Sequence, residues 1–303
     1  MAQIIISVIV PVYQHKNYIQ VALDSILMQK TQYSYEILIG DDYSTDGTRE
    51  LLKNYKRKYK DKIRLFLRPY NLGATLNGYM LYKQAKGKYI SILEGDDYWI
   101  DEYKLEKQVK YLESHKEYSA VFHKCKIVNE KGEKARVNYS NFYHSKEGYA
   151  IEDYEKGMLP GQVGTIMFKN IFSIPNKNYN FYYKIHNLVG DQTLYCLLLA
   201  EGSFGYISEE LGAYRFVQKI GKTNAMSRYL KRNVCFEEWK YHCKLEMCMK
   251  KKVGKNINLK EYRKQEVKVA KRILKEKKDF ISLFMFLKIC VLNILWDYIL
   301  KFL

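Results

Sequence analysis

The chain has 303 residues, 47% of them hydrophobic, and it carries 51 Lys and Arg against 33 Asp and Glu, a formal net charge of +18. This apolar content excludes a disordered chain and is enough for one large core, or for one core with a smaller helical appendage. The six cysteines show no CxxC spacing, which argues against a disulfide scaffold and favours a reducing compartment.

The first hundred residues alternate between two kinds of segment. Four short apolar runs are typical of strands buried on both faces of a sheet: 4–10, 35–39, 63–67 and 89–93. The segments between them have apolar residues at helical spacing or a capping residue at their start, and are predicted helices: 18–29, 46–59 and 74–86. This order predicts an α/β fold with a mainly parallel sheet, right-handed crossovers and helices on both faces.

The order of elements becomes mixed beyond residue 100. We predict helices over 101–114 and 188–200, and strands over 119–128, 165–168, 204–207 and 212–216. Positive charge then accumulates, because residues 228–278 contain 18 basic and 6 acidic side chains. A boundary near residue 220 therefore separates the α/β part from a helical, basic extension over 221–303.

Distinctive residues follow each of the first four predicted strands. Ligands of open parallel sheets bind beyond the carboxyl ends of the strands, so these segments form the candidate site. They are Pro11-Val12-Tyr13, Asp41-Asp42, the stretch 68–73 with Arg68, Asn71 and Gly73, and Glu94-Gly95-Asp96-Asp97. Periodicity alone places all four at one edge of the sheet.

The acidic cluster at 94–97 has two interpretations. Its three carboxylates would repel one another unless a cation or a strongly polar setting accepted them. Oxygen ligands at this density suit Mg²⁺ or Mn²⁺, which usually take further ligands from water and substrate phosphates. A solvated acidic turn is the alternative, and the position of the cluster directly after a buried strand favours the metal site.

Four ordered segments of the chain resemble the successive signatures of family 2 glycosyltransferases. They are 8–13 (VIVPVY), 36–48 (EILIGDDYSTDGT), 71–73 (NLG) and 93–99 (LEGDDYW). The resemblance covers about residues 4–217. It implies a GT-A fold, a nucleotide-diphosphate sugar donor, by family preference a UDP-sugar, and inversion at the anomeric carbon. It also implies a catalytic domain over 1–220, with a nucleotide-binding half at about 1–100 and an acceptor half at about 101–220.

The resemblance assigns several residues to the nucleotide. Pro11 and Tyr13, with Val12 between them, would frame the base, and Asp42, with Asp41 beside it, would accept a hydrogen bond from the base. Three more would lie near the nucleotide: Arg68, Asn71 and Gly73, the last allowing close backbone approach.

The resemblance also divides the acidic cluster. Asp96 would be the ligand of Mn²⁺ or Mg²⁺ in the DxD-type motif, with Gly95 beside it. Glu94 stands where the family more often has aspartate, so its contact with ribose or metal is open. Asp97 and Trp99 are placed on the acceptor or diphosphate side.

Asp191 is the candidate catalytic base. It lies in Gly190-Asp191-Gln192 at a predicted helix start, which resembles the acceptor-side acidic position of the family, and a helix N-terminus favours an ionised carboxylate. A simple N-cap aspartate is the alternative. Arg215 is placed on the diphosphate side, although no histidine follows it within two residues, unlike many relatives.

Residues 280–303 are almost wholly apolar, as in a membrane span. Apart from Lys288, the polar residues fall within an arc of roughly 100° on a helix: Ser282, Asn293, Asp297 and Lys301. Together with the basic segment, this pattern fits in-plane attachment to an anionic inner membrane leaflet. Packing on the catalytic domain, or a seam between two copies in a homo-oligomer, is the alternative. We do not expect a nucleic-acid partner, because the chain has no matching motif.

Three functions fit these observations. The first is a membrane-associated transferase that extends a glycan or lipid-linked acceptor of a surface polysaccharide such as capsule. The second is a sugar nucleotidyltransferase, although Pro11-Val12-Tyr13-Gln14 stands where that class has a glycine-rich basic loop. The third is a non-catalytic sugar-nucleotide-binding protein. The first residues show no signal peptide, so we expect a cytoplasmic protein, peripheral on the inner face of the cell membrane.

Overall fold

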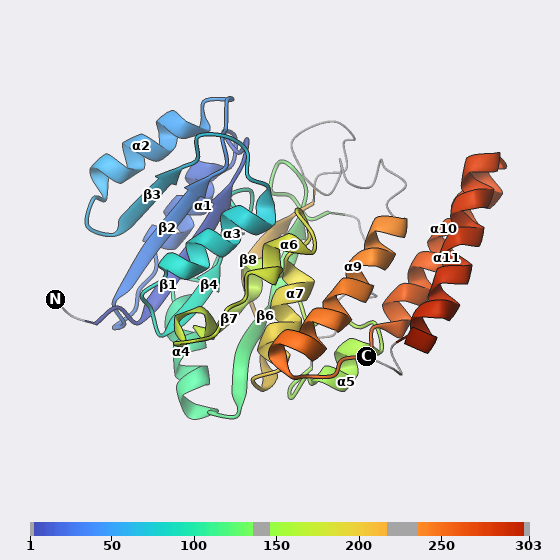
Figure 1. The fold of residues 1–303 in the computed structure, drawn as a ribbon. Helices are drawn as coiled ribbons and strands as arrows, with labels where there is room; N and C mark the ends of the chain where they lie inside the picture. Colours follow the sequence, from blue (N-terminus) through green and yellow to red (C-terminus); the bar gives the residue numbers. More distant parts are fainter. Residues whose placement is uncertain (1–2, 136–145, 217–234, 300–303) are drawn as a thin grey trace.

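The computed structural model describes residues 3–135, 146–216 and 235–299, and these residues form an eight-stranded sheet flanked by helices (Figure 1). The strands lie in the order β3-β2-β1-β4-β7-β6-β8-β5. Their bounds are β1 Ile6–Val12, β2 Tyr35–Asp41, β3 Ile63–Leu67, β4 Tyr89–Ile92, β5 Tyr98–Trp99, β6 Tyr118–Val128, β7 Met167–Lys169 and β8 Ser203–Arg215.

The strands of the first hundred residues that were predicted from apolar runs are parallel neighbours. Ile6 of β1 lies opposite Tyr35 of β2 on one side and Tyr89 of β4 on the other. The short strand β7 then pairs antiparallel with both β4 and β6, whereas β6 and β8 are parallel. The predicted α/β class, with a mainly parallel sheet and helices around it, is confirmed.

Helices cover both faces of the sheet. Residues of α1, α2 and α4 share one buried cluster, and residues of α3, α6 and α7 share the other. Along β1, Val8 and Val10 belong to the first cluster and Ile9 to the second, because successive side chains of a strand alternate between faces. The bounds are α1 Ile19–Leu27, α2 Thr48–Lys58, α3 Ala74–Gln84, α4 Lys104–Ser114, α5 Ile151–Glu155, α6 Phe181–Lys184 and α7 Asp191–Leu199.

Two predicted elements differ from the structure. The two strands predicted over 204–207 and 212–216 are one strand, β8, which stays paired with β6 through register shifts near Lys124. The helix predicted from residue 188 begins at Asp191. Residues 186–189 turn back on themselves instead, since the ring Nδ1 of His186 accepts the N–H groups of Leu188 at 3.1 Å and Val189 at 2.8 Å.

Three further helices lie at the opposite end of the molecule from α2 and β3 (Figure 1): α9 Cys235–Cys248, α10 Lys260–Lys277 and α11 Phe280–Ile299. One side of α9 joins the core, because Tyr241 and Leu245 belong to the same buried cluster as Leu194 of α7. Its other side packs on α10 and α11 through a small cluster that includes Trp239. The boundary predicted near residue 220 lies outside the described residues, and the division into domains stays a prediction.

Candidate functional site

The end of β1 holds two of the predicted site segments together. The carbonyl of Val12 accepts the N–H of Asp42 at 2.8 Å, and the carbonyl of Pro11 accepts the N–H of Gly95 at 3.3 Å. Pro11 and Tyr13 are half-buried, while the side chain of Val12 belongs to the core. Because β1 is the central strand between β2 and β4, its last residues bring the loops that follow those strands to one place.

The acidic loop, residues 94–97, turns tightly after β4. The N–H of Asp97 donates to the carbonyl of Glu94 at 3.0 Å. Gly95 packs so closely that a Cβ there would lie 2.6 Å from Nδ1 of His15. The carboxylate of Asp96 is 17% exposed and lies 3.9 Å from Nε2 of the same histidine. The carboxylate of Asp96 and the closely packed Gly95 therefore both lie beside the imidazole ring of His15, which is in the loop after β1.

The carboxylates of the acidic loop disfavour one another's ionisation. Burial, together with the negative charges of Asp96 and Asp191, raises the pKa of Glu94 to about 8. Burial and the charges of Asp96 and Glu94 raise the pKa of Asp97 well above its ordinary value. A bound cation would relieve this repulsion, so the donor chemistry of the loop suits a hard divalent ion.

The described residues contain no group of three or more His, Cys, Asp or Glu side chains arranged to hold a metal ion.

Asp97 and Trp99 belong to the interior. Asp97 is 3% exposed, and its carboxylate accepts the N–H of Arg215 at 2.7 Å and the amide of Gln162 at 3.3 Å. Trp99 is 2% exposed, and the ammonium of the buried Lys104 lies 3.8 Å from the centre of its ring system. Both side chains are buried in this structure, and their placement on the acceptor or diphosphate side stays a prediction.

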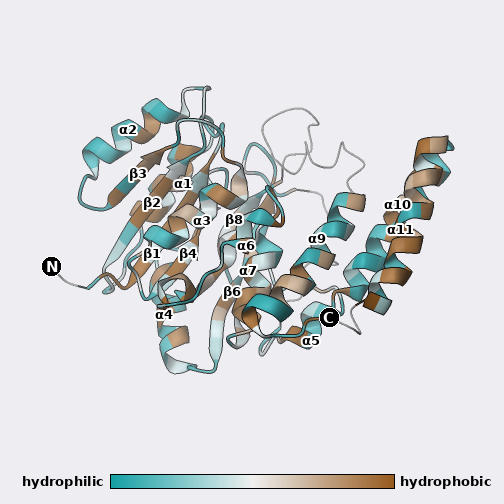
Figure 2. Ribbon diagram, in the orientation of Figure 1, coloured by the Kyte–Doolittle hydropathy of each residue, from teal (hydrophilic) through white to brown (hydrophobic). Residues whose placement is uncertain are grey.

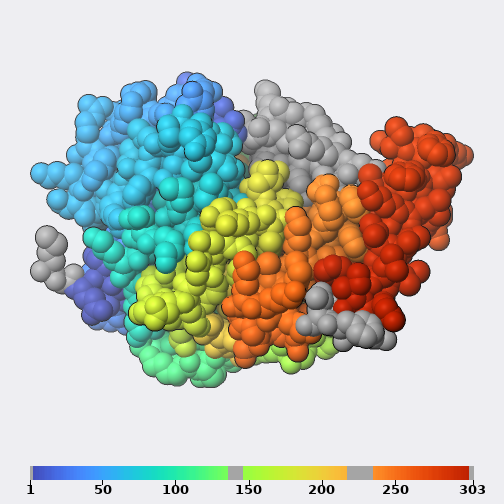
Figure 3. Space-filling view, in the orientation of Figure 1, coloured from blue at the N-terminus to red at the C-terminus, as the bar shows by residue number. Residues whose placement is uncertain are grey.

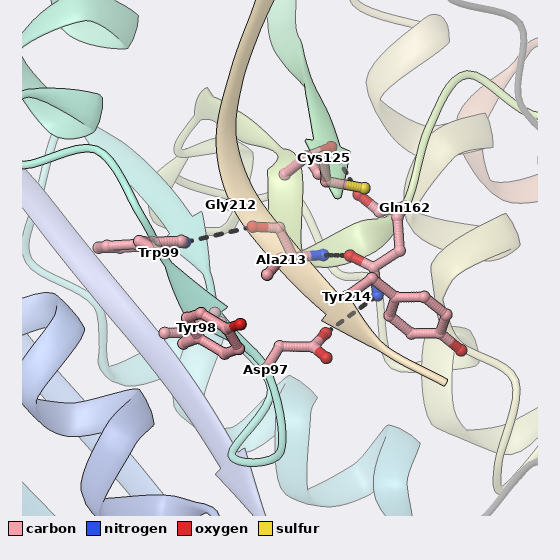
Figure 4. A pocket seen from close by; sticks show the side chains of 11 residues that line it. Asp97, Tyr98, Trp99, Cys125, Gln162, Gly212, Ala213 and Tyr214 are labelled. Atoms are coloured by element: carbon pink, nitrogen blue, oxygen red, sulfur yellow. Dashed lines mark hydrogen bonds between the residues drawn. The ribbon is translucent and has the colours of Figure 1, made fainter. Parts of the chain in front are cut away.

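A small cavity lies behind the acidic loop, between β5, β6 and β8 (Figure 4). Figure 4 shows the carboxylate of Asp97 pointing toward the side chain of Gln162 at its edge. Its volume of about 10 Å³ leaves room for about one water molecule, which excludes it as the site of a sugar. The candidate site is the outer side of the loop, where Asp96 lies.

Arg215 lies beside the acidic loop, and protein groups occupy its guanidinium. Nε donates to the carbonyl of Asp96 at 2.9 Å, and Nη1 donates to the carbonyl of Glu130 at 2.8 Å. The guanidinium also stacks over the ring of Tyr18, 4.7 Å from its centre. These contacts give Arg215 a positioning role, and a direct contact with diphosphate stays a prediction.

Asp41 and Asp42 organise the loops around the predicted base site. Asp41 is fully buried and pairs with Arg49 at 2.6 Å, so it orders the loop after β2 and is shielded from a ligand. The two oxygens of Asp42 accept the N–H groups of Leu72 at 2.6 Å and Gly73 at 2.9 Å. Each oxygen keeps a second lone pair, so Asp42, which is 3% exposed, retains the capacity to accept the predicted hydrogen bond from a base.

The predicted stretch 68–73 closes this side of the site. Arg68 is 9% exposed, and its Nε donates to the side chain of Asn77 at 3.0 Å. Asn71 donates from its amide to the carbonyl of Asp42 at 3.1 Å. Gly73 has a φ of +87°, and a Cβ there would lie 3.0 Å from the carbonyl of Asn187. The glycine thus allows close approach to a protein segment, the one that leads to Asp191.

Asp191 opens α7, and its Oδ1 accepts the N–H of Gln192 at 2.8 Å. Burial raises the pKa of Asp191 above its ordinary value, which makes the carboxylate a stronger base. Its charge contributes to the raised pKa of Glu94, so the two carboxylates are close enough to interact electrostatically. Thr75 fixes the approach to α7, since its hydroxyl donates to the carbonyl of His186 at 2.8 Å.

Several site residues were missed from the sequence. The amide of Gln162 donates at 3.3 Å both to Glu94 and to Asp97. His15 contacts Asp96, and its place just after β1 was a usable signal. Glu238 of α9 carries a pKa raised to about 8, first by burial and then by the charges of Glu266 and Asp191. Glu238 lies 47 positions from Asp191 in a basic segment, and no local pattern points to it.

Comparisons with known proteins identify the family and the fold of the chain. Residues 7–174, more than half of the chain, match the model of the family described as Glycosyl transferase family 2. The putative teichuronic acid biosynthesis glycosyltransferase TuaG of Bacillus subtilis is 30% identical over 176 residues, which cover 55% of this chain and 67% of TuaG.

Other relatives match over a smaller part of their length. The uncharacterized protein Rv1520 of Mycobacterium tuberculosis is 40% identical over 122 residues, which cover 40% of this chain and 35% of that protein. The chain thus spans about a third of the length of the mycobacterial relatives it matches.

Among solved structures, residues 1–349 of S. aureus TarS in complex with UDP-GlcNAc superpose with a TM-score of 0.64 and 15% identity, over 94% of this chain and 79% of that one. At this identity the likeness concerns the fold, and the expectation of a GT-A fold with additional helices is confirmed.

Proposed function

This chain belongs to glycosyltransferase family 2, and we propose that it transfers a sugar from a UDP-sugar to a hydroxyl group of a glycan or lipid-linked acceptor, with inversion at the anomeric carbon. The observation that carries the proposal is the gathering of the segments that follow β1, β2 and β4 at one edge of the sheet, with the charge of Asp191 acting on Glu94 of the acidic loop. TarS binds UDP-GlcNAc in its solved complex, which supports UDP as the nucleotide.

The proposed reaction forms and breaks one bond at the same carbon. The acceptor hydroxyl oxygen attacks the anomeric carbon from the face opposite the diphosphate, and the bond from that carbon to the diphosphate oxygen breaks, releasing UDP. Asp191 takes the proton of the attacking hydroxyl. Its raised pKa supports this role, because a carboxylate of higher basicity removes the proton more readily.

Asp96 is the residue that would hold Mn²⁺ or Mg²⁺, together with diphosphate oxygens and water. When bound, such an ion offsets the negative charge of the departing diphosphate. The protein's own residues hold Asp96 in place. Arg215 donates to the carbonyl of Asp96, and the amide of Gln162 donates to the carboxylates of Glu94 and Asp97 on either side of it.

The class of the acceptor is inferred from the name of one relative. TuaG is named for teichuronic acid biosynthesis, which is the assembly of a surface polysaccharide. An acceptor of this class, whether a free glycan or a lipid-linked one, fits the proposal.

Calorimetric titration of UDP-sugars, with and without Mn²⁺, tests donor and metal together. We expect at least about tenfold tighter binding with the ion, a difference of ~1.4 kcal/mol, and loss of that difference in Asp96→Ala. Equal affinity with and without the ion would overturn the metal assignment. Product analysis separates the alternatives: pyrophosphate released from UTP identifies a nucleotidyltransferase, and donor binding without UDP release to any glycan acceptor identifies a binding protein.

A further inference from the structure

Three polar residues of the predicted arc on α11 face the protein, whereas Lys288 is exposed and the fourth residue of the arc, Lys301, lies outside the described residues. Asn293 accepts a hydrogen bond from the indole N–H of Trp239 at 3.2 Å, and Asp297 pairs with Arg263 at 2.7 Å. Ser282 is 4% exposed. These three residues belong to the arc that the sequence predicted, and the structure turns them toward α9 and α10 instead of toward water.

The opposite side of α11 is apolar and exposed. Its exposed fractions include Phe280 79%, Ile281 73%, Phe284 59%, Val291 56%, Ile294 72% and Tyr298 62%. These side chains run from the first turn to the last of a 20-residue helix, which is ~30 Å long. Single exposed apolar residues are common on soluble proteins, but a continuous exposed apolar strip of this length marks an interaction surface. Figure 3 shows the α10–α11 hairpin projecting at the edge of the molecule.

The helix beside this strip is strongly basic. Helix α10 contains eight basic and three acidic residues. Lys264, Lys268, Lys271 and Lys275 recur at intervals of four, three and four, so they form one exposed stripe along the helix. Figure 2 shows polar and apolar bands running along the same hairpin. An exposed apolar strip on one helix and an exposed row of lysines on the helix packed against it have the composition of a helix pair that lies on an anionic lipid surface.

Contacts on the inner side hold α11 to the protein along its length. Arg263 of α10 is 1% exposed and forms ion pairs with Glu246 of α9 and with Asp297 of α11. The indole N–H of Trp296 donates to Glu246 at 2.8 Å. Although α11 is long and apolar enough to cross a bilayer, a crossing would have to break this buried ion-pair network.

We propose that the outward face of α11 inserts into the headgroup region of an anionic bilayer, in the plane of the membrane, while the lysine stripe of α10 contacts lipid phosphates. Charge favours this occupant over a second copy of the chain, because a second copy would bring its own excess of positive charge. The proposal goes beyond the transferase function and does not depend on it.

The experiment is co-sedimentation of the full chain with vesicles of phosphatidylcholine, with or without about one third phosphatidylglycerol. We expect binding to the anionic vesicles, at least about tenfold weaker binding to the neutral ones, and weakening by salt. The double variant Phe284→Glu/Ile294→Glu should abolish binding, and changing the four stripe lysines to Gln should reduce it about tenfold or more.

A matched control removes the same charge elsewhere, through Gln at Lys53, Lys58, Lys60 and Lys62, which are exposed on and after α2. Vesicle binding of this control should equal that of the unmodified chain. Circular dichroism and UDP-sugar binding show whether each variant is folded. The absence of vesicle binding, a dimer in light scattering that Phe284→Glu/Ile294→Glu dissociates, or resistance of the bound chain to alkaline carbonate extraction would each overturn the proposal.

Discussion

The guanidinium Nε of Arg215 donates to the backbone carbonyl of Asp96 at 2.9 Å, across 119 positions of the sequence. The backbone N–H of Arg215 also donates to the carboxylate of Asp97 at 2.7 Å. The last residue of β8 thereby fixes the loop that follows β4. The position of the proposed metal ligand depends on the acceptor half of the fold as much as on the nucleotide half.

Replacing Arg215 with Lys tests this dependence. Lysine keeps the charge but lacks the planar fork that serves several carbonyls at once. We expect UDP release to slow by about tenfold or more, and the free energy of unfolding to fall by ~1–3 kcal/mol because buried carbonyls lose their donor. Steady-state kinetics and urea denaturation measure the two effects. Arg57→Lys, at an exposed position of α2, is the control, and wild-type turnover in Arg215→Lys would contradict the positioning role.

Replacing either of two glycines with alanine should change the stability of the protein, in opposite directions. A Cβ at Gly95 would lie 2.6 Å from Nδ1 of His15, so Gly95→Ala should destabilise the protein by ~1–3 kcal/mol and weaken donor binding. A Cβ at Gly78, within α3, has its nearest neighbour at 3.9 Å, so Gly78→Ala should stabilise by ~0.5–1 kcal/mol. Thermal unfolding checks both signs. If steric contact is the cause, adding His15→Ala to Gly95→Ala recovers most of the lost stability.

Thr75→Val tests whether the hydrogen bond from Thr75 positions Asp191 at the start of α7. The variant loses the hydroxyl that donates to the carbonyl of His186 but keeps the similar shape of the side chain. We expect kcat to fall while the Kd for UDP stays within about twofold, because the bond positions Asp191 and not the nucleotide. Thr75→Ser, which keeps the hydroxyl, should retain activity. Equal kcat values for the Val and Ser variants would remove this positioning role.

The strands of the nucleotide-binding half could be predicted because each one is encoded by a short run of neighbouring apolar residues. The apolar runs that became β1, β2 and β4 are buried on both faces, and strand direction alone places Asp42 and Asp96 at one edge. The acceptor half depends on contacts between residues far apart. Trp99 looked like a site residue next to an acidic cluster, but its pairing with Gly212 of β8 places it in the core.

The extension shows the limit of a periodic pattern. A helical wheel correctly groups Ser282, Asn293 and Asp297 on one side of α11, but it contains no information about what that side faces. Trp239 and Arg263, on two other helices, turn the polar arc inward. The same reasoning applies to Gln162, whose two carboxylate partners are more than sixty positions away.

Two buried histidines predict how stability depends on pH. Burial, aided by the charge of Lys104, lowers the pKa of His123 to about 3, and burial, aided by Arg263 and His186, lowers that of His242 to about 3. Both histidines bind a proton more readily in the unfolded chain than in the folded one. The free energy of unfolding is therefore at its full value above about pH 6.5 and falls as the pH is lowered toward 3. The free energy of unfolding should decrease by up to ~1.4 kcal/mol per pH unit for each histidine.

Urea denaturation between pH 7 and pH 5 measures this slope. His123→Gln should make the slope shallower by the share of one histidine. An identical slope in His123→Gln and the unmodified chain would show that this histidine does not control acid stability.

The central claim is that Asp191 is the base that accepts the proton of the acceptor hydroxyl. Its most direct test is the turnover number of Asp191→Asn, measured as UDP release with saturating donor, Mn²⁺ and acceptor. Asparagine has the same shape and cannot take the proton, so we predict a loss of about 10²- to 10⁴-fold in kcat, with the Kd for the UDP-sugar and the melting temperature nearly unchanged. A kcat within about twofold of the unmodified enzyme would contradict the claim.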